Sequence, residues 1–309
     1  MEKIRDITDP PGGVNSGFRC GTVALAGRSN VGKSTLLNRI LGTKLAIVAE
    51  KPQVTRSRIL GIRTHPGAQM VWIDLPGIHR ARSLLNERMV QTARRSVADA
   101  DVVVVVIDAK AGLLGGDGDI AELAAARGCP WLFVVNKIDL ARSNELLSLV
   151  SRVSERFRQI DVVPVSARTG ENVEELERTV ARLLPVGPAL YPEDELTDQT
   201  ARMIVQEVVR EKIFEATEAE IPYQAAVIVE SFEEKPDQNL NVVQATILVE
   251  RDTQKRILIG KGGAMIREIG RRARLDLEAF FGVRFFLELF VKVQPDWTKS
   301  PRILDELGM

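Results

Sequence analysis

The sequence has few cysteines, no net charge and no long apolar run, and each absence narrows what the chain can be. Its two cysteines, Cys20 and Cys129, both adjoin predicted buried strands, so we expect core packing rather than a disulfide, as suits a reducing cytosol. The absence of a run of about 18 apolar residues excludes a membrane-spanning helix. Because 42 lysines and arginines balance 42 aspartates and glutamates, only a local excess of charge can indicate a nucleic-acid or membrane partner.

Length and patterning predict two domains. At 309 residues, 45% of them apolar, the chain is long enough for two sizeable cores. Residues 1–19 contain Pro10-Pro11-Gly12-Gly13 and no apolar core of a signal peptide, so we expect a disordered extension. In residues 20–184, strand-like runs alternate with helical patterns, which predicts an α/β domain with a mostly parallel sheet covered by helices. The expected strands are 22–26, 57–63, 70–73, 102–107, 132–135 and 162–165, and the expected helices are 33–41, 83–97, 119–126, 144–157 and 172–184.

The most informative motif is Gly-Arg-Ser-Asn-Val-Gly-Lys-Ser at residues 27–34, between a predicted buried strand and a predicted helix. This is the pattern of a phosphate-binding loop of P-loop proteins. Its two glycines let backbone N–H groups approach phosphates, and the helix N-terminus adds its positive dipole end. Lys33 would reach the β- and γ-phosphates, and the Ser34 hydroxyl would ligate Mg²⁺. The loop alone leaves ATP open as the ligand.

A second motif, Asp74-Leu-Pro-Gly77, follows the apolar run 70–73. Asp74 therefore lies at the C-terminal end of a strand, where open α/β sheets bind ligands. It can hold Mg²⁺ through a water, and the Gly77 N–H can sense the γ-phosphate. Taken alone, this motif also describes ordinary turns.

The third and fourth motifs, Asn136-Lys-Ile-Asp139 and Ser166-Ala167, indicate guanine. An ionised Asp139 can accept hydrogen bonds from guanine N1–H and its exocyclic amine, a donor pair that adenine lacks. Asn136 and the backbone N–H of Ala167 then fit the O6 and N7 side. The third motif alone could be a solvated turn, but all four motifs follow strand ends in order. The expected nucleotide-binding residues are Gly27, Ser29, Asn30, Val31, Gly32, Lys33, Ser34, Thr35, Asp74, Gly77, Asn136, Lys137, Asp139, Ser166 and Ala167.

Prolines and a glycine in residues 185–199 break the helical pattern and predict a linker to a second domain, residues 200–295. The second domain has the predicted order helix, two strands, two helices and a strand, with Gly260-Lys-Gly-Gly263 between the two helices. This order predicts a smaller α+β domain, a KH RNA-binding domain of the bacterial type (type II). Its expected elements are helix 200–216, strands 225–232 and 242–250, helices 255–259 and 264–280, and strand 284–293. We expect residues 296–309 to form a C-terminal tail.

A basic patch surrounds the glycine turn. Residues 251–274 carry eight basic side chains against two acidic ones, a net charge of +6 in a chain of zero net charge. The residues expected to bind RNA phosphates are Arg256, Gly260, Lys261, Gly262, Gly263, Arg267 and Arg271. The bases would lie in a groove lined by Ile257, Ile259, Ile266 and Ile269. The alternative is a set of solvated helix-face charges around an ordinary glycine turn.

Together these features resemble the Era family of bacterial GTPases, in which a nucleotide domain is followed by a KH domain. The resemblance covers roughly residues 20–300. It rests on Gly-Arg-Ser-Asn-Val-Gly-Lys-Ser-Thr at 27–35, Lys-Pro-Gln-Val-Thr-Arg at 51–56, Asp-Leu-Pro-Gly-Ile-His at 74–79, Tyr-Pro-Glu-Asp at 191–194, Val-Glu-Arg at 249–251 and Ile-Gly-Lys-Gly-Gly at 259–263.

The resemblance implies GTP hydrolysis with Mg²⁺, binding near the 3′ end of small-subunit ribosomal RNA, and a role in maturing the small ribosomal subunit in the cytoplasm. By the same resemblance, Thr55 would be the first-switch threonine that ligates Mg²⁺, although Val54 stands where the family often has a second threonine. The expected metal ligands are Ser34, Thr55 and Asp74, and the residues expected to serve catalysis are Lys33, Thr55 and Gly77. We expect a monomer. The family leaves room for a peripheral membrane contact, but the sequence offers no strong amphipathic anchor.

Hydrolysis is expected to be slow because Ile78 stands where Ras-type GTPases have a water-orienting glutamine. In GTPases that resemble this family, a phosphate-loop asparagine can help to hold K⁺ where an arginine finger would otherwise sit, and Asn30 either does so here or only stabilises the loop. The neighbouring His79 is a weaker candidate for a catalytic base, since phosphoryl transfer depends mainly on positioning and electrostatics.

An RNA-binding adaptor or chaperone with a mainly structural nucleotide site is the alternative function. A related tRNA-modifying GTPase is disfavoured, because that family has a C-terminal cysteine motif and the last cysteine here is Cys129. Tandem-domain relatives are disfavoured because the sequence contains one phosphate-loop motif.

Overall fold

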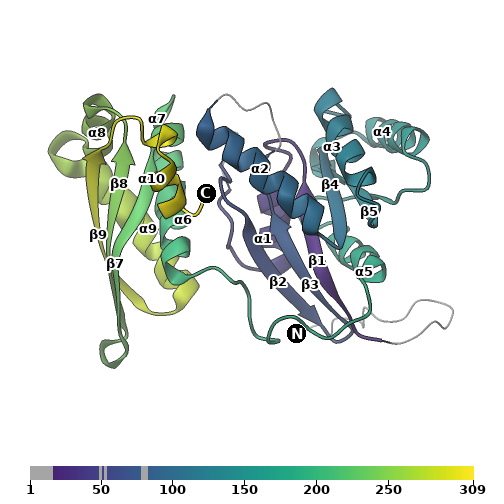
Figure 1. Cartoon of the computed structure of the whole chain (residues 1–309), viewed down its shortest axis with the longest axis horizontal. Coiled ribbons are helices and arrows are strands. Elements are labelled where there is room, and N and C mark those ends of the chain that lie inside the picture. The colour runs from purple at the N-terminus through teal and green to yellow at the C-terminus, as the bar shows by residue number, and fades with distance from the viewer. Residues whose placement is uncertain (1–16, 49–50, 52–53, 78–82) are drawn as a thin grey trace. The chain divides into compact units, whose positions relative to one another are not determined.

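The computed structural model describes residues 17–48, 51, 54–77 and 83–309, which form two compact units (Figure 1). The first is built mainly from residues 17–46, 55–77 and 89–198, and the second mainly from residues 199–309. The predictions made for residues 1–16 and for Ile78 and His79 lie outside the described residues. Within the described part of the chain, no helix combines the length and the apolar character needed to cross a membrane.

The first unit is a six-stranded sheet. Its strands are β1 (Arg19–Ala26), β2 (Ile59–His65), β3 (Ala68–Asp74), β4 (Val102–Asp108), β5 (Trp131–Asn136) and β6 (Val162–Pro164). Their order is β2-β3-β1-β4-β5-β6, with β2 antiparallel to β3 and the other pairs parallel. Because such a sheet is covered on both faces, a central strand such as β4 is apolar almost throughout. The mostly parallel sheet predicted from the sequence is confirmed.

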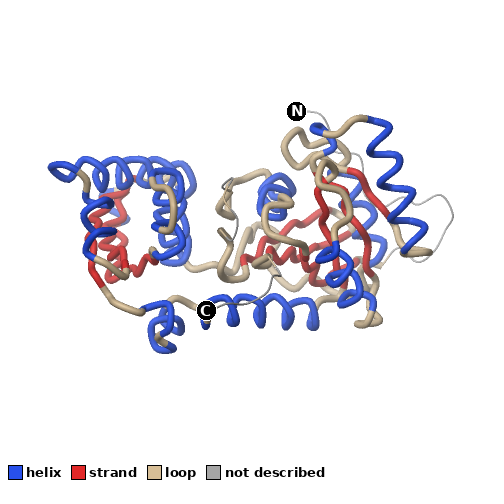
Figure 2. Tube along the Cα trace, turned by 90° about the horizontal axis from the view of Figure 1, so that it is seen from above, coloured by secondary structure: helices blue, strands red, loops and turns tan. Residues whose placement is uncertain are grey.

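Helices cover both faces of this sheet (Figure 2). They are α1 (Lys33–Leu41), α2 (Leu84–Asp99), α3 (Gly115–Ala125), α4 (Ser143–Arg156) and α5 (Val173–Leu183). Ala93 of α2, Ile120 of α3 and Leu149 of α4 share one apolar core with the sheet. On the other side, α1 and α5 contact each other and β3. This packing fixes the carboxyl ends of the strands, from which the predicted site residues extend.

The linker was predicted at residues 185–199, and residues 185–198 of it belong to the first unit and pack against its sheet. The fully buried Gln69 of β3 accepts a hydrogen bond from the Tyr191 backbone N–H at 2.9 Å and donates one to the Tyr191 carbonyl at 2.8 Å. The Tyr191 side chain packs against Leu60 and Ile62 of β2. Side chains distant in sequence therefore hold this segment in place.

The second unit is a three-stranded sheet in the order β7-β8-β9 with helices packed against it. Its elements are α6 (Ala201–Ala216), the short helix α7 (Ile221–Gln224), β7 (Ala226–Lys235), β8 (Leu240–Val249), α8 (Asp252–Ile259), α9 (Ala264–Phe281), β9 (Arg284–Val293) and α10 (Pro301–Glu306). β7 and β8 are antiparallel, and β8 and β9 are parallel. Val209 of α6 and Ile269 of α9 share the core with Ala245 of β8. The predicted α+β fold with this element order is confirmed.

The C-terminal residues are folded rather than an extended tail. Trp297 is fully buried, and its indole N–H donates to the carbonyl of Gln224 at 2.9 Å. Leu304 of α10 is also fully buried. The sequence analysis treated these residues only as a tail, because the apolar residues after Trp297 are confined to the short run 303–309.

Candidate functional site

The phosphate loop lies between β1 and α1 and holds a buried lysine. Lys33 is 6% exposed, and its Nζ donates to the carbonyls of Gly27 at 3.1 Å and Arg28 at 2.9 Å. Burial lowers the pKa of Lys33 to about 8, although the nearby Asp74 opposes the shift. An anion in the loop would restore the full charge of the ammonium group, so this lysine fits a phosphate ligand.

Two glycines allow the loop to meet its neighbours closely. Gly32 has φ 96°, and a Cβ at this position would lie 2.3 Å from Nδ2 of Asn136. A Cβ at Gly77, after β3, would lie 2.5 Å from Oγ of Ser29. Any side chain at either position would therefore push the loop away from the other motifs.

Three oxygen-bearing side chains meet beside Lys33 and fit a magnesium ion. The Ser34 hydroxyl donates to Oδ2 of Asp74 at 2.6 Å and lies 3.1 Å from Oγ1 of Thr55. Asp74 is fully buried, and its Oδ1 has no hydrogen-bond partner. Burial raises the pKa of Asp74, and Lys33 and the two hydroxyls oppose the rise. A hard cation prefers oxygen ligands, so Ser34 and Thr55 would coordinate Mg²⁺ directly and Asp74 would hold it through a water.

The carboxylate expected to recognise guanine is held in place by a serine. Oδ1 of Asp139 accepts from the Ser166 hydroxyl at 2.7 Å, and the Ser166 oxygen accepts from the Thr169 N–H at 3.1 Å. Oδ2 of Asp139 is buried and accepts no hydrogen bond, although Nε of Arg168 lies 3.2 Å from it. A fixed carboxylate with an unsatisfied oxygen suits the paired N–H donors of guanine.

Asn136 and Lys137 fasten the base motif to the phosphate loop. Asn136 is 1% exposed; its Nδ2 donates to the Val31 carbonyl at 2.9 Å and its Oδ1 accepts from the Ala167 N–H at 3.0 Å. Nζ of Lys137 donates to the Asn30 carbonyl at 2.7 Å and lies 2.7 Å from Oδ2 of Asp108.

The sequence analysis predicted that Asn136 and the Ala167 N–H would contact the base, whereas in the structure they form a hydrogen bond with each other. Their hydrogen bond positions the loop that carries Ser166. The remaining nucleotide-site prediction, Thr35, follows Ser34 in the first turn of α1.

Replacing Asp139→Asn should shift the preference of the site from guanine to xanthine. The new amide cannot accept both guanine donors, but it can donate to the C2 oxygen of xanthine, so GDP affinity should fall by about 100-fold or more. Competition between GDP and xanthosine diphosphate measures the change. Asp119→Asn is a matched control, because it makes the same chemical change in an exposed carboxylate of α3, and it should leave the guanine preference unchanged. An unchanged guanine preference in Asp139→Asn would contradict this assignment.

The glycine turn of the second unit joins α8 to α9 in a conformation that needs glycine. Gly260, Gly262 and Gly263 have φ values of 70°, 59° and 77°. A Cβ at Gly260 would lie 2.8 Å from Cβ of Met265, so no side chain fits there. The Arg267 guanidinium donates to the carbonyls of Gly262 at 2.7 Å and Gly263 at 3.1 Å and so braces the turn.

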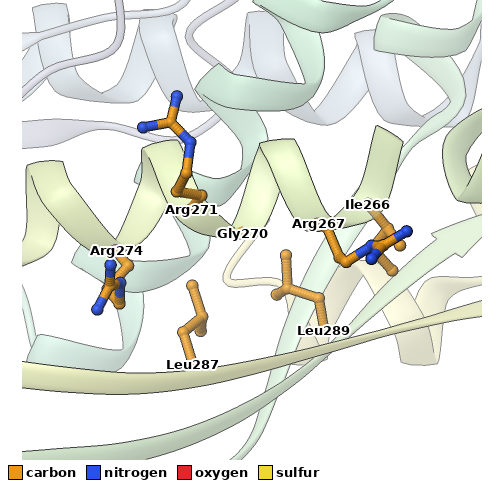
Figure 3. Close-up of a pocket in the computed structure, with 7 residues that line it drawn as sticks. All are labelled: Ile266, Arg267, Gly270, Arg271, Arg274, Leu287 and Leu289. Carbon is orange, nitrogen blue, oxygen red and sulfur yellow. The ribbon is translucent and has the colours of Figure 1, made fainter. Parts of the chain in front are cut away.

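A groove of about 300 Å³ lies between α9 and β9 (Figure 3). It is lined by Ile266, Arg267, Gly270, Arg271, Arg274, Leu287 and Leu289. Leu287 and Leu289 point from β9 toward α9 and, with Ile266, form an apolar floor. The three arginines follow one another along α9. An apolar floor beside guanidinium groups suits unstacked bases next to a phosphate backbone.

The sequence analysis identified part of this groove. Ile266, Arg267 and Arg271 line it as expected, but Ile257, Ile259 and Ile269 do not. Ile269 is fully buried in the core, and Ile257 is exposed on α8. The reason is the helical period, which places residues 266, 270 and 274 on one face of α9 and residues 269, 273 and 277 on the core face. That period and the alternation along β9 could have identified Arg274, Leu287 and Leu289.

The remaining predicted RNA contacts lie on the surface. Arg256 and Lys261 are exposed, in α8 and in the glycine turn. Arg271 forms two hydrogen bonds with Glu268, at 2.8 and 2.9 Å. Part of its charge is therefore already compensated, and we expect it to bind phosphate less strongly than Lys261 does.

The chain is similar over nearly its whole length to known proteins. A family model described as a 50S ribosome-binding GTPase matches residues 22–137, and one described as a KH domain matches residues 220–298. The chain is 46% identical to GTPase Era of Geobacter metallireducens, over 94% of this chain and 98% of the relative.

Solved structures are also similar to this chain over nearly its whole length. An Era variant of Aquifex aeolicus bound to GDP and AlF4⁻ superposes with a TM-score of 0.91 at 38% identity, covering 94% of this chain and 99% of that one. A second structure, Era in complex with MgGDPNP and nucleotides 1506–1542 of 16S ribosomal RNA, matches with the same TM-score, identity and coverage. The ligands of these relatives are guanine nucleotides, in agreement with the pocket described above.

Proposed function

Since the chain belongs to the Era family of GTPases, we propose that it is an RNA-binding switch that uses GTP to assist the maturation of the small ribosomal subunit. Its RNA target is the region near the 3′ end of the small-subunit ribosomal RNA, which the related Era binds together with MgGDPNP. The observation that carries this proposal is the groove between α9 and β9, with its apolar floor and arginines next to the glycine turn. We infer from a ribosomal RNA target that the chain acts in the cytoplasm.

In the RNA site, the glycine turn approaches the backbone of a single strand. Gly262 has no atom within 4 Å of the position that a Cβ would take, so this face of the turn is open. The Lys261 ammonium and the exposed guanidinium groups of Arg256 and Arg274 neutralise phosphates. Leu287 and Leu289 accommodate the faces of the bases.

In the nucleotide site, water converts GTP to GDP and phosphate, and the chain contributes positioning and charge. The Lys33 ammonium neutralises the β- and γ-phosphates, and the Gly77 N–H contacts the γ-phosphate. Ser34 and Thr55, with Asp74 through a water, would hold Mg²⁺, which would supply further positive charge beside the phosphates. The chain hydrolyses GTP as an Era-type GTPase.

We further propose that K⁺ compensates for the isoleucine that stands at position 78, with Asn30 helping to hold it. Asn30 is exposed in the phosphate loop and has φ 67°. A monovalent cation there would offset charge that an arginine finger offsets in other GTPases. We expect hydrolysis to be about 10-fold or more faster in K⁺ than in Na⁺ at equal ionic strength. Asn30→Ala should remove the difference. Equal rates in the two salts with the unmodified chain would contradict the proposal.

The switch is tested by measuring GTP hydrolysis with and without an RNA that carries the target region. Since coupling between two sites is reciprocal, a GTP analogue should change RNA affinity and RNA should change GTP affinity by the same factor. If neither ligand affected the other, the chain would be an RNA-binding adaptor whose nucleotide site is mainly structural.

A further inference from the structure

We propose that Arg168 controls how readily guanine nucleotides leave the pocket, by taking the place of the base at the Asp139 carboxylate. Arg168 follows the Ser166-Ala167 motif directly and was not among the predicted site residues. The proposal concerns nucleotide exchange in the pocket and does not depend on the RNA target.

The contact between the two side chains is an ion pair without a directed hydrogen bond. Nε of Arg168 lies 3.2 Å from Oδ2 of Asp139. The same oxygen is buried and accepts no hydrogen bond, so the N–H group does not point at it. A rotation of the guanidinium group would convert this contact into a charge-assisted hydrogen bond.

The side chain of Arg168 can make this movement because its backbone is held and its guanidinium is free to turn. Arg39 of α1 donates to the Ala167 carbonyl at 3.0 Å and also to the Arg168 carbonyl. The Arg168 side chain is 75% exposed, whereas that of Asp139 is 11% exposed. An exposed cation is thus anchored by its backbone beside a carboxylate whose Oδ2 is buried.

This arrangement matters when the base departs. A buried carboxylate that loses two hydrogen-bond donors is costly unless another donor replaces them. Arginine is always charged and has five N–H groups, so Arg168 can satisfy Oδ2 once guanine leaves. By lowering the free energy of the base-free carboxylate, Arg168 weakens guanine binding and speeds nucleotide release.

Arg168 would have the opposite effect on nucleotide release if it packed over the face of the base. It would then stabilise the bound nucleotide, and its removal would speed release. The measured direction therefore separates the two roles.

The test is the dissociation rate of GDP carrying a fluorescent ribose label, chased with excess unlabelled GDP, from the full chain and from Arg168→Ala. We expect release to slow by about 2- to 5-fold, the upper part of the range measured for exposed ion pairs, with the association rate little changed. Arg178→Ala is the matched control, because it removes an exposed arginine whose partners, Glu174 and Glu175, lie in its own helix. Its release rate should equal that of the unmodified chain.

A second comparison shows whether the effect passes through the carboxylate. In the Asp139→Asn background, measured with labelled xanthosine diphosphate, Arg168→Ala should no longer slow release, since the charge that Arg168 contacts has been removed. Unchanged or faster GDP release from Arg168→Ala would overturn the proposal. A slowing of equal size in the Asp139→Asn background would overturn it as well.

Discussion

Lys33→Ala is expected to lose tight binding of guanine nucleotides, with an affinity for GDP at least about 100-fold lower than that of the unmodified chain. The Lys33 ammonium is buried between the carbonyls of Gly27 and Arg28. It is therefore the group that faces the phosphates with the least competition from water, and a methyl group cannot replace its charge or its hydrogen bonds. Titration with labelled GDP measures the loss.

The fold should survive this change. Burial lowers the pKa of Lys33, which means that the charged form is held at a cost in the absence of phosphate. Removing it should not destabilise the free protein, and a thermal unfolding curve checks this. Lys299→Ala, which removes an exposed lysine paired with Asp296, is the control and should bind GDP normally. Near-normal GDP affinity in Lys33→Ala would be incompatible with a phosphate-binding loop at residues 27–34.

The second large effect is expected in the glycine turn, where Lys261→Asp combined with Gly262→Asp should weaken RNA binding by about 100-fold or more and leave GTP hydrolysis unchanged. The two substitutions replace one positive charge with two negative charges at the point where the phosphate backbone approaches. The left-handed φ of Gly262, 59°, strains any residue with a side chain, but Asp adopts such a value more readily than most residues and no atom lies within 4 Å of the Cβ position. We therefore expect a small loss of stability, which the control at Gly282 shares.

The control for the RNA prediction uses the other end of α9. Gly282 has φ 70° and also has open space at its Cβ position. Gly282→Asp combined with Lys299→Asp therefore changes the charge by the same amount in a similar backbone conformation outside the groove. Filter binding or fluorescence anisotropy with one RNA compares the two variants. If both lost RNA affinity equally, the effect would come from net charge and not from the glycine turn.

Elements that local patterning determines were predicted from the sequence, most of them with bounds that differ by a few residues from those of the structure. The helix predicted to start at Lys33 does start there, and the strand predicted at 284–293 has these bounds. By contrast, the helix predicted at 119–126 begins at Gly115, within a glycine-rich stretch of low helix propensity. Asp117 explains the difference, because it is fully buried and forms a 2.8 Å ion pair with Arg28 of the phosphate loop. A contact between residues 89 positions apart overrides local propensity there.

Contacts between residues distant in sequence also limited how much of the two sites could be predicted. The motifs identified Lys33, Ser34, Asp74 and Asp139, since each follows a predicted strand at a known spacing, and the structure brings these residues to one edge of the sheet. The motifs could not show that Asn136 pairs with the Ala167 N–H, or that Arg168 contacts Asp139, because both depend on how two loops meet. The apolar floor of the groove was also missed, since Leu287 and Leu289 belong to a strand far from the glycine turn.

The most direct test of the RNA-binding switch is the affinity of the full chain, with a GTP analogue bound, for a synthetic RNA copy of the 3′-terminal region of small-subunit ribosomal RNA. A scrambled RNA of the same length and composition serves as the comparison. We expect the ribosomal sequence to bind at least about 10-fold more tightly, and we expect this preference to disappear in the Lys261→Asp, Gly262→Asp variant. Equal affinity for the two RNAs would contradict a specific ribosomal RNA target.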